Sequence, residues 1–204
     1  MLLDEDGIYE TLAALLCLAA AGVVFKAFRL SGDYAEEGGK RWVLLVLACA
    51  FLFMFLEEIS WGQRIFAIPT PEFLRSVNLQ QETNLHNLKP LRASSNLLTG
   101  AILLFFVLVP PMARMFPWIA RTAARFGLPV PGLRFTLLGL TVAVCNRINY
   151  FIVYKGIPQN DRLSIGEAYE SGIELLLFLF ALEILRRARK GRKNGPRVTP
   201  AHPL

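Results

Sequence analysis

Five long runs of apolar residues constrain the fold of this chain more than any other feature. They lie at about 8–28, 42–61, 96–115, 135–154 and 167–186. A helix needs roughly 20 apolar residues to cross about 30 Å of hydrocarbon. The chain has only 204 residues, yet 54% of them are hydrophobic and 15 are phenylalanine, which is more apolar surface than a soluble domain of this size can bury. The sequence therefore predicts an all-α fold, a polytopic bundle of about five transmembrane helices with short interfacial helices.

The two ends of the chain fix the predicted domain organisation. Acidic residues precede the first apolar run, and no basic segment does, so this run does not resemble a cleaved signal peptide and is expected to remain as a helix. A dense series of lysines and arginines follows the last run. We expect one transmembrane domain over 1–188 and a basic, disordered cytoplasmic tail over 189–204.

The basic residues also predict the orientation. With the tail in the cytoplasm and five spans, 15 lysines and arginines lie inside and 6 lie outside, while Arg147 falls within a span. This distribution agrees with the positive-inside rule and places the N-terminus outside. A basic run directly after a membrane helix indicates contact with anionic lipid headgroups, so the net charge of +6 does not indicate nucleic acid as a partner. Membrane lipids are the expected partners.

Charged residues inside the predicted spans are the first candidates for function, because a charge at membrane depth is costly and usually paired. Glu57 and Glu58 end the second span, and Arg147 lies in the outer half of the fourth, between Asn146 and Asn149. In the fifth span, Glu167, Glu170 and Glu174 have i, i+3, i+7 spacing, which predicts that they share one helical face. Arg147 is expected to find an anion in this stripe.

The segment between the second and third spans adds a possible metal ligand pair. Glu82 and His86 are four residues apart and would share a face in a helix, and a Glu/His pair at this spacing suits a divalent metal ion. The predicted topology brings this pair to the outer side together with the charged residues above. The polar set expected there comprises Glu57, Glu58, Gln63, Glu82, His86, Asn146, Arg147, Asn149, Glu167, Glu170 and Glu174.

One block of this segment resembles known sequences. The stretch Glu57-Glu-Ile-Ser-Trp-Gly-Gln-Arg-Ile-Phe, followed by Glu82-Thr-Asn-Leu-His-Asn, is similar to a block of small uncharacterised bacterial polytopic membrane proteins. The resemblance covers about 35 of the 204 residues. It implies a bacterial inner membrane protein, and it carries no established activity.

Three functions remain open. The first is a membrane-embedded enzyme that acts on a lipid or lipid-linked substrate at the outer leaflet. The second is a non-catalytic subunit that binds protein partners in the membrane, and the third is a small proton-coupled transporter. The sequence shows no HExxH, GxSxG, Walker or GxGxxG motif.

The enzyme hypothesis assigns a role to each candidate residue. General acid and base chemistry falls to Glu58, Glu82, His86 and Glu170. A divalent metal ion would be held by Glu58, Glu82, His86, Glu170 and Glu174. Arg147 would bind a phosphate or carboxylate on the substrate, with Asn146, Asn149 and Gln63 as further substrate contacts.

Overall fold

Helices make up most of the part of the chain that the computed structural model describes. This part comprises residues 5–31, 41–156 and 161–194, and the side chains at some helical positions, including 149–150, 152–156 and 161–168, are not described. Within it, the only β-type pairing is an isolated bridge between Asn78 and Leu88. The predicted all-α class is confirmed.

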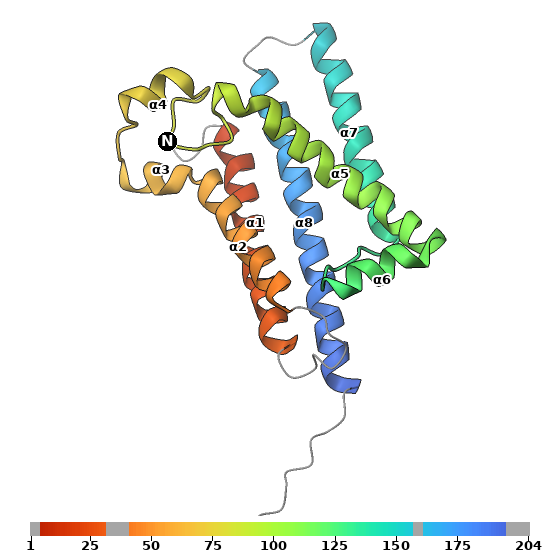
Figure 1. Ribbon diagram of the computed structural model, residues 1–204. Coiled ribbons are helices and arrows are strands. Elements are labelled where there is room, and N and C mark those ends of the chain that lie inside the picture. Colours follow the sequence, from red (N-terminus) through yellow and green to blue (C-terminus); the bar gives the residue numbers. More distant parts are fainter. Residues whose placement is uncertain (1–4, 32–40, 157–160, 195–204) are drawn as a thin grey trace, which may run out of the picture.

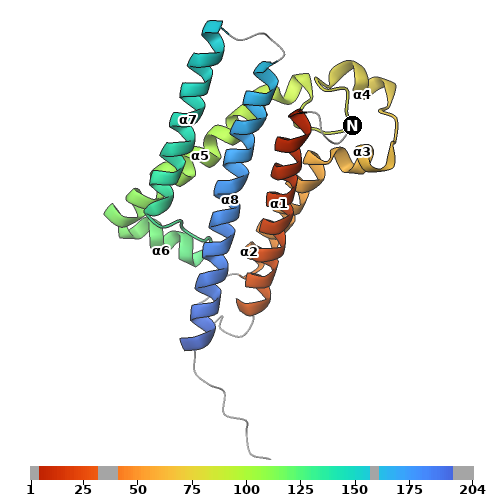
Figure 2. The same cartoon turned by 180° about the vertical axis from the view of Figure 1, so that it is seen from behind.

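Five long helices run back and forth between the two ends of the molecule (Figure 1). Each coincides with one predicted apolar run and extends beyond it or, in the second case, stops slightly short of it. Because successive helices alternate in direction, the segment that joins α2 to α5 lies at the same end of the bundle as the start of α8, which the reverse view also shows (Figure 2). The long helices are α1 (Glu5–Leu30), α2 (Trp42–Glu58), α5 (Arg92–Met115), α7 (Arg134–Gly156) and α8 (Asp161–Asn194).

Short helices occupy the connections at both ends. The connection from α2 to α5 contains η3 (Ser60–Gly62), α3 (Gln63–Phe66), α4 (Glu72–Val77) and η4 (Lys89–Leu91). At the opposite end, α6 (Pro117–Arg125) joins α5 to α7, and Pro at its first position suits a helix start because the missing N–H would have no partner there. We call the first the upper end and the second the lower end, as in Figure 1.

A stripe of small residues on α1 explains why this helix lies between α2 and α8. Ala13, Cys17, Ala20, Val24 and Ala27 recur at alternating spacings of four and three residues, and each is at most 2% exposed. Small side chains on one helical face let neighbouring backbones approach closely, as is common between membrane helices. The helix α1 accordingly packs along both α2 and α8.

Aromatic packing joins the other half of the bundle. Phe106 of α5, Phe135 of α7 and Phe180 of α8 contact one another with ring centroids 5.3–5.7 Å apart, and all three are buried. Edge-to-face and stacked aromatic pairs at such distances stabilise packing beyond the area that they bury. This cluster fixes α5 and α7 against α8 below the middle of the bundle.

The outer surface of the bundle is strongly apolar. Large hydrophobic side chains are exposed along all five long helices, including Leu15 of α1, Leu52 of α2, Leu104 of α5, Leu137 of α7 and Leu175 of α8. Only 11% of the most apolar window of α5 is buried. Apolar surface on this scale is not typical of a soluble monomer.

Two helices in the described residues are long and apolar enough to cross a membrane, over Gly7–Leu30 and Lys89–Met115. The predicted number of five spans is therefore confirmed only in part. The helix α2 has 17 residues and is about 25 Å long, somewhat less than the hydrocarbon thickness. The apolar part of α8 is interrupted by glutamates, and part of α7 falls on side chains that are not described.

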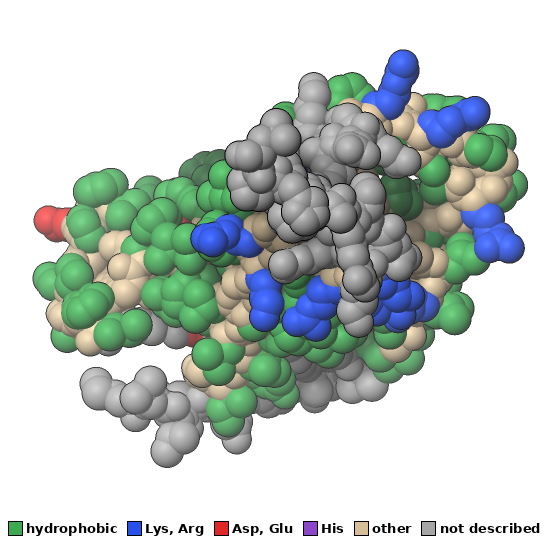
Figure 3. Space-filling view, turned by 90° about the horizontal axis from the view of Figure 1, so that it is seen from below, with side chains coloured by type: hydrophobic (Ala, Val, Ile, Leu, Met, Phe, Trp, Pro, Cys, Tyr) green, Lys and Arg blue, Asp and Glu red, His purple; other side chains and the backbone are tan. Residues whose placement is uncertain are grey.

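Basic side chains gather at the lower end (Figure 3). The buried carboxylate of Glu183 accepts hydrogen bonds from Arg134 of α7 and from Arg187 one turn further along α8, the latter at 3.0 Å. Arg186 also pairs with it at 3.1 Å. The helix α8 continues through Asn194, so the first residues of the predicted disordered tail are helical, and residues 195–204 lie outside the described part.

Candidate functional site

A cavity of about 360 Å³ lies at the upper end between α2, α5, α8 and the segment before α5. Its deeper wall is apolar, because Met54, Leu98, Ile102 and Ile173 contribute to it. Its polar groups come from elements that are far apart in the sequence. They are Glu57 and Glu58 of α2, His86 of the connecting segment, Ser94 and Thr99 of α5, and Glu170 and Glu174 of α8.

The two glutamates of α8 line the cavity one turn apart, as their helical spacing predicts. Glu174 is 5% exposed, and its Oε2 has no hydrogen-bond partner among the described residues. Glu174 is also close enough to Glu58 and Glu170 for their charges to interact. Since buried polar atoms are nearly always hydrogen-bonded, this oxygen is the clearest sign of an unmet interaction in the cavity. The side chain of Glu167 lies outside those that the structure describes.

Glu57 holds the connecting segment against the end of α2. Its Oε1 accepts a hydrogen bond from the indole N–H of Trp61 at 2.7 Å. Its Oε2 accepts backbone hydrogen bonds from Leu85 at 2.6 Å and from His86 at 3.0 Å. Because the side chain is only 4% exposed, these bonds satisfy a carboxylate that would otherwise be costly to bury. Glu57 therefore has a structural role at the rim of the cavity.

The chain reverses direction directly after α2 through three successive left-handed residues. Ser60, Trp61 and Gly62 have φ values of 47°, 57° and 80°. This region is unfavourable for residues with a side chain and costs on the order of 1–3 kcal/mol at each such position. Hydrogen bonds offset the cost, because Thr83 donates to the carbonyl of Ser60 at 2.9 Å and Trp61 donates to Glu57. The turn directs the connecting segment back over the cavity.

Glu82 lies within the connecting segment and does not line the cavity. Its Oε2 accepts hydrogen bonds from the hydroxyl of Ser60 and from the amide of Asn84, the latter at 3.2 Å. Asn84 in turn accepts a hydrogen bond from Asn78 at 2.8 Å. The residues from 79 to 87 form bends and turns rather than a helix, so the condition under which Glu82 and His86 would share a helical face is not met. Asparagine side chains satisfy the backbone here and thereby compete with helix formation.

Gln63 belongs to the same hydrogen-bond network. Its carbonyl oxygen accepts from the backbone N–H of Thr83 at 2.8 Å and from the hydroxyl of Thr83 at 2.7 Å. Its amide group donates to Thr70. Gln63 does not line the cavity. The oxygen and the nitrogen of its side-chain amide both bind other residues of the connection, so Gln63 links α3 to Thr70 and Thr83.

His86 lies at the cavity wall with both ring nitrogens near protein groups. Its Nδ1 is 3.4 Å from Oε2 of Glu57, and its Nε2 is 3.0 Å from the side-chain amide nitrogen of Asn87. Glu170 is near enough for its charge to interact with the ring.

Arg147 and Asn146 do not line the cavity. The guanidinium group of Arg147 lies over the ring of Phe151, 5.1 Å from its centroid, on its own helix. The structure thus brings Glu58, His86, Glu170 and Glu174 together and places Arg147, Asn146, Gln63 and Glu82 elsewhere. The predicted substrate contact at Asn149 lies outside the described side chains.

The described residues do not gather a metal site. No three histidine, cysteine, aspartate or glutamate side chains within that part of the chain come together as metal ligands. Of the predicted ligand set, Glu82 is held apart by Ser60 and Asn84. The divalent ion therefore stays a prediction, and we assign no step to one.

Several cavity residues were missed by the sequence analysis. The wall residues Leu98, Ser94 and Thr99 carry no chemical signal, because only packing places them opposite the glutamates. The network around Asn78 and Asn84 did have a signal, since asparagine, glutamine and threonine dominate residues 78–87 of an otherwise apolar chain.

Comparisons with protein-family models, with curated proteins and with solved structures found no match.

Proposed function

We propose that this chain is a polytopic membrane protein whose upper cavity binds a lipid or lipid-linked substrate at the outer leaflet and promotes acid–base chemistry on it. The observation that carries the proposal is the buried Oε2 of Glu174, which lines the cavity and has no hydrogen-bond partner among the described residues. A hydroxyl or amino group of a ligand would satisfy it.

The chemistry of the cavity supports an amphiphilic ligand. Its polar groups are four carboxyl side chains, one histidine and two hydroxyl groups, and among the described side chains no lysine or arginine lines it. Such a set recognises hydrogen-bond donors and cationic groups. The apolar wall suits acyl or isoprenoid chains. The headgroup that fits is therefore an amine or a polyol, rather than the phosphate or carboxylate expected as the ligand of Arg147.

Roles within this cavity follow from how tightly each side chain is already bound. Glu57 is committed to the connecting segment by its hydrogen bonds to Leu85 and His86. Glu174 is positioned to receive the ligand's donor group. Glu170, which is closer to the surface, is the group we assign to proton exchange with the ligand, and His86 would assist once Asn87 releases its Nε2.

The membrane placement supports the same proposal. Five alternating helices with an apolar exterior fit a five-span topology with the N-terminus outside, in which the cavity opens at the outer leaflet. The resemblance of the segments around Glu57 and His86 to bacterial membrane proteins adds the bacterial inner membrane as the proposed location.

The binding step is tested by the lipids that accompany the protein. The full-length chain is purified from its membrane in mild detergent, and bound lipids are identified by mass spectrometry against the bulk lipid extract. We expect one amine-bearing or polyol lipid to be enriched, and Glu174→Gln to reduce that enrichment about 10- to 100-fold, because hydrogen bonds to charged groups contribute about 1.5–3 kcal/mol.

Two further variants make the result decisive. Glu72→Gln changes an exposed carboxylate on α4 away from the cavity and should retain the lipid. Thr99→Trp adds bulk to the cavity wall and should exclude it. The proposal fails if Glu174→Gln and Thr99→Trp both carry the same lipid complement as the unmodified protein.

The chemical step is tested separately by incubating the protein with its enriched lipid and monitoring new products. Glu170→Gln should abolish product formation while lipid binding persists. If the lipid stays bound and unchanged in the unmodified protein, the cavity is a binding site without catalysis.

A non-catalytic subunit is the second candidate, and the exposure of α5 favours it. This helix offers an apolar face of which only a small part is covered, and a partner helix would pack there as readily as lipid. Co-purification of a second membrane protein at fixed stoichiometry, lost in Leu104→Arg but retained in Glu174→Gln, would support this function over the enzyme.

A further inference from the structure

A second cavity lies at the lower end, between α1 and α8, on the opposite side of the molecule from the candidate site. Its volume is about 700 Å³, which falls within the range of about 300–1,000 Å³ typical of small-molecule pockets. Two kinds of side chain line it. The apolar ones are Leu30, Leu182 and Leu185, and the basic ones are Lys26, Arg186, Arg189 and Lys190.

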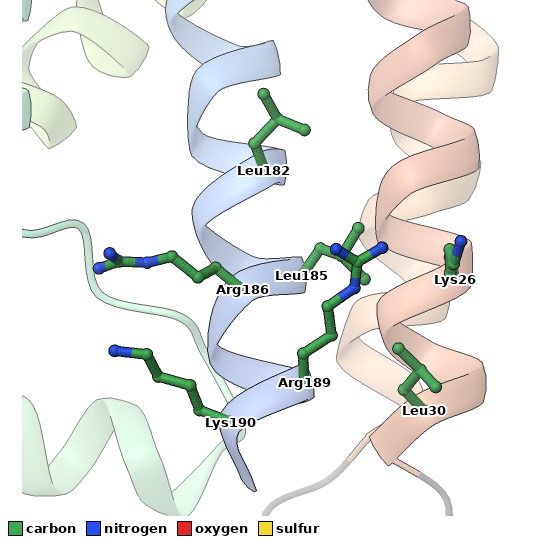
Figure 4. A pocket seen from close by; sticks show the side chains of 7 residues that line it. All are labelled: Lys26, Leu30, Leu182, Leu185, Arg186, Arg189 and Lys190. Atoms are coloured by element: carbon green, nitrogen blue, oxygen red, sulfur yellow. The ribbon is translucent and has the colours of Figure 1, made fainter. Parts of the chain in front are cut away.

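The two helices contribute positive charge from both sides of this cavity. Arg189 extends from α8 into the space toward α1, where Lys26 lies (Figure 4). Leu182 and Leu185 point to the same side of α8 as Arg189, whereas Arg186 and Lys190 extend along its other flank (Figure 4). Leucines and cations of both helices thus line the cavity together (Figure 4).

In the described part of the chain, carboxylates do not form ion pairs with all the basic side chains that line this cavity. The ion pairs at this end go to Glu183, and their basic members are Arg134, Arg186 and Arg187. Lys26, Arg189 and Lys190 take part in none of them. Three cations around one cavity would repel one another unless an anion lies between them.

We propose that this cavity binds the phosphate group of an anionic phospholipid, with Arg189 and Lys26 on the phosphate and the acyl chains along Leu182 and Leu185. The chemistry shared by all ligands of this kind is a phosphate anion, which guanidinium and ammonium groups bind through charge-assisted hydrogen bonds. The leucines and the volume favour a lipid over free phosphate. Basic pockets between membrane helices on the cytoplasmic side bind anionic headgroups in this way.

The proposal is independent of the upper cavity, because the two sites share no residue. It also differs from a general attraction of the basic tail to the membrane surface. Lipid binding through surface attraction depends on the total charge of the protein, whereas lipid binding in a pocket depends on which basic side chains are present.

The experiment uses the full-length protein, delipidated in detergent and titrated with lipid while native mass spectrometry counts bound molecules. The probes are dioleoylphosphatidylglycerol, dioleoylphosphatidylcholine and inorganic phosphate. We expect one dioleoylphosphatidylglycerol to bind more tightly than the zwitterionic lipid with the same chains. Lys26→Gln and Arg189→Gln should each weaken it about fivefold, and the double variant about 30-fold, since each basic side chain near a membrane surface contributes about 1 kcal/mol.

The matched control removes the same charge from the same end. Arg121 and Arg125 of α6 are exposed and do not line the cavity, so Arg121→Gln with Arg125→Gln should leave the affinity unchanged. Arg189→Lys keeps the charge and should retain most of the binding, which separates loss of the site from loss of folding.

Three results would overturn the proposal. Equal weakening in the α6 control would show a non-specific charge effect. Equal affinity for both lipids would show that the phosphate anion is not recognised. Displacement of the lipid by inorganic phosphate at matching concentration would keep the anion site but exclude a lipid as its natural ligand.

Discussion

Removing the carboxylate of Glu57 should release the segment that covers the upper cavity. In Glu57→Ala the backbone N–H groups of Leu85 and His86 lose acceptors that lie 2.6 Å and 3.0 Å away. Hydrogen bonds to a charged group contribute about 1.5–3 kcal/mol each, so the two together give about 3–6 kcal/mol of local stability. Even the lower value corresponds to an increase of about 100-fold in the rate of amide exchange at these positions.

The assay is hydrogen–deuterium exchange of the purified protein, read on peptides that cover residues 79–91. Glu57→Gln keeps one carbonyl oxygen for the backbone but places an amide N–H₂ group opposite another donor, the indole N–H of Trp61. In this variant the amide exchange of Leu85 and His86 should increase about tenfold. Glu72→Ala on the exposed face of α4 is the control and should exchange like the unmodified protein. Unchanged protection of Leu85 and His86 in Glu57→Ala would refute the anchoring role.

Three further outcomes are expected. Glu183→Ala should lower the free energy of unfolding by about 1–3 kcal/mol in thermal denaturation, because three arginines lose a buried partner but are half exposed and can be rehydrated. Gly139→Ala places a Cβ 3.0 Å from a valine of α5 and should cost about 1–3 kcal/mol by overpacking, whereas Gly172→Ala finds its nearest neighbour at 3.7 Å and should be tolerated. A membrane-impermeant maleimide should label Ser76→Cys but not Thr122→Cys in intact cells, because the two exposed positions lie at opposite ends of the bundle.

Each of these outcomes has a result that contradicts its reasoning. Full stability of Glu183→Ala would show that the arginine cluster does not hold α7 to α8. A larger loss in Gly172→Ala than in Gly139→Ala would mean that the close approach of α5 and α7 is not where the structure places it. Labelling of Thr122→Cys from outside would invert the proposed orientation.

Part of the candidate site was accessible to sequence reasoning, and the predictions for Glu82 and Arg147 failed for two different reasons. Glu170 and Glu174 were predicted on one face, because helical spacing alone determines that relation. The sequence also predicted that Glu170 and Glu174 lie at the same end of the bundle as Glu58 and His86, because successive helices alternate in direction. The inclusion of Glu82 failed because the segment from 79 to 87 is not helical. The side chain of Asn78 binds backbone groups there instead, since it accepts from the N–H groups of Gln80 and Glu82 and donates to the carbonyl of Asn84.

Arg147 illustrates what periodicity leaves open. Its depth along α7 follows from the rise per residue, and the cost of a charge at that depth predicted an anionic partner in the glutamate stripe of α8. The direction in which it points around the helix depends on how α7 packs against α5 and α8. In the structure that packing is set by Phe106, Phe135 and Phe180, and Arg147 lies over Phe151 rather than at the wall of the upper cavity.

The pattern of hydropathy and charge along the chain was sufficient to predict the helices, their alternating direction and the separation of an acidic upper end from a basic lower end. These features depend on residues that are close in sequence, because transfer free energies and helical rise can be summed along the chain. Both cavities required the assembled bundle. The small-residue stripe of α1 lets both α2 and α8 pack against this helix, and α5 crosses in front of them in Figure 1. The rotation of each helix in this packing determines which glutamates line the upper cavity and which arginines line the lower one. The rotation of a helix about its axis depends on contacts between residues that are distant in sequence, so it cannot be predicted by summing over neighbouring residues.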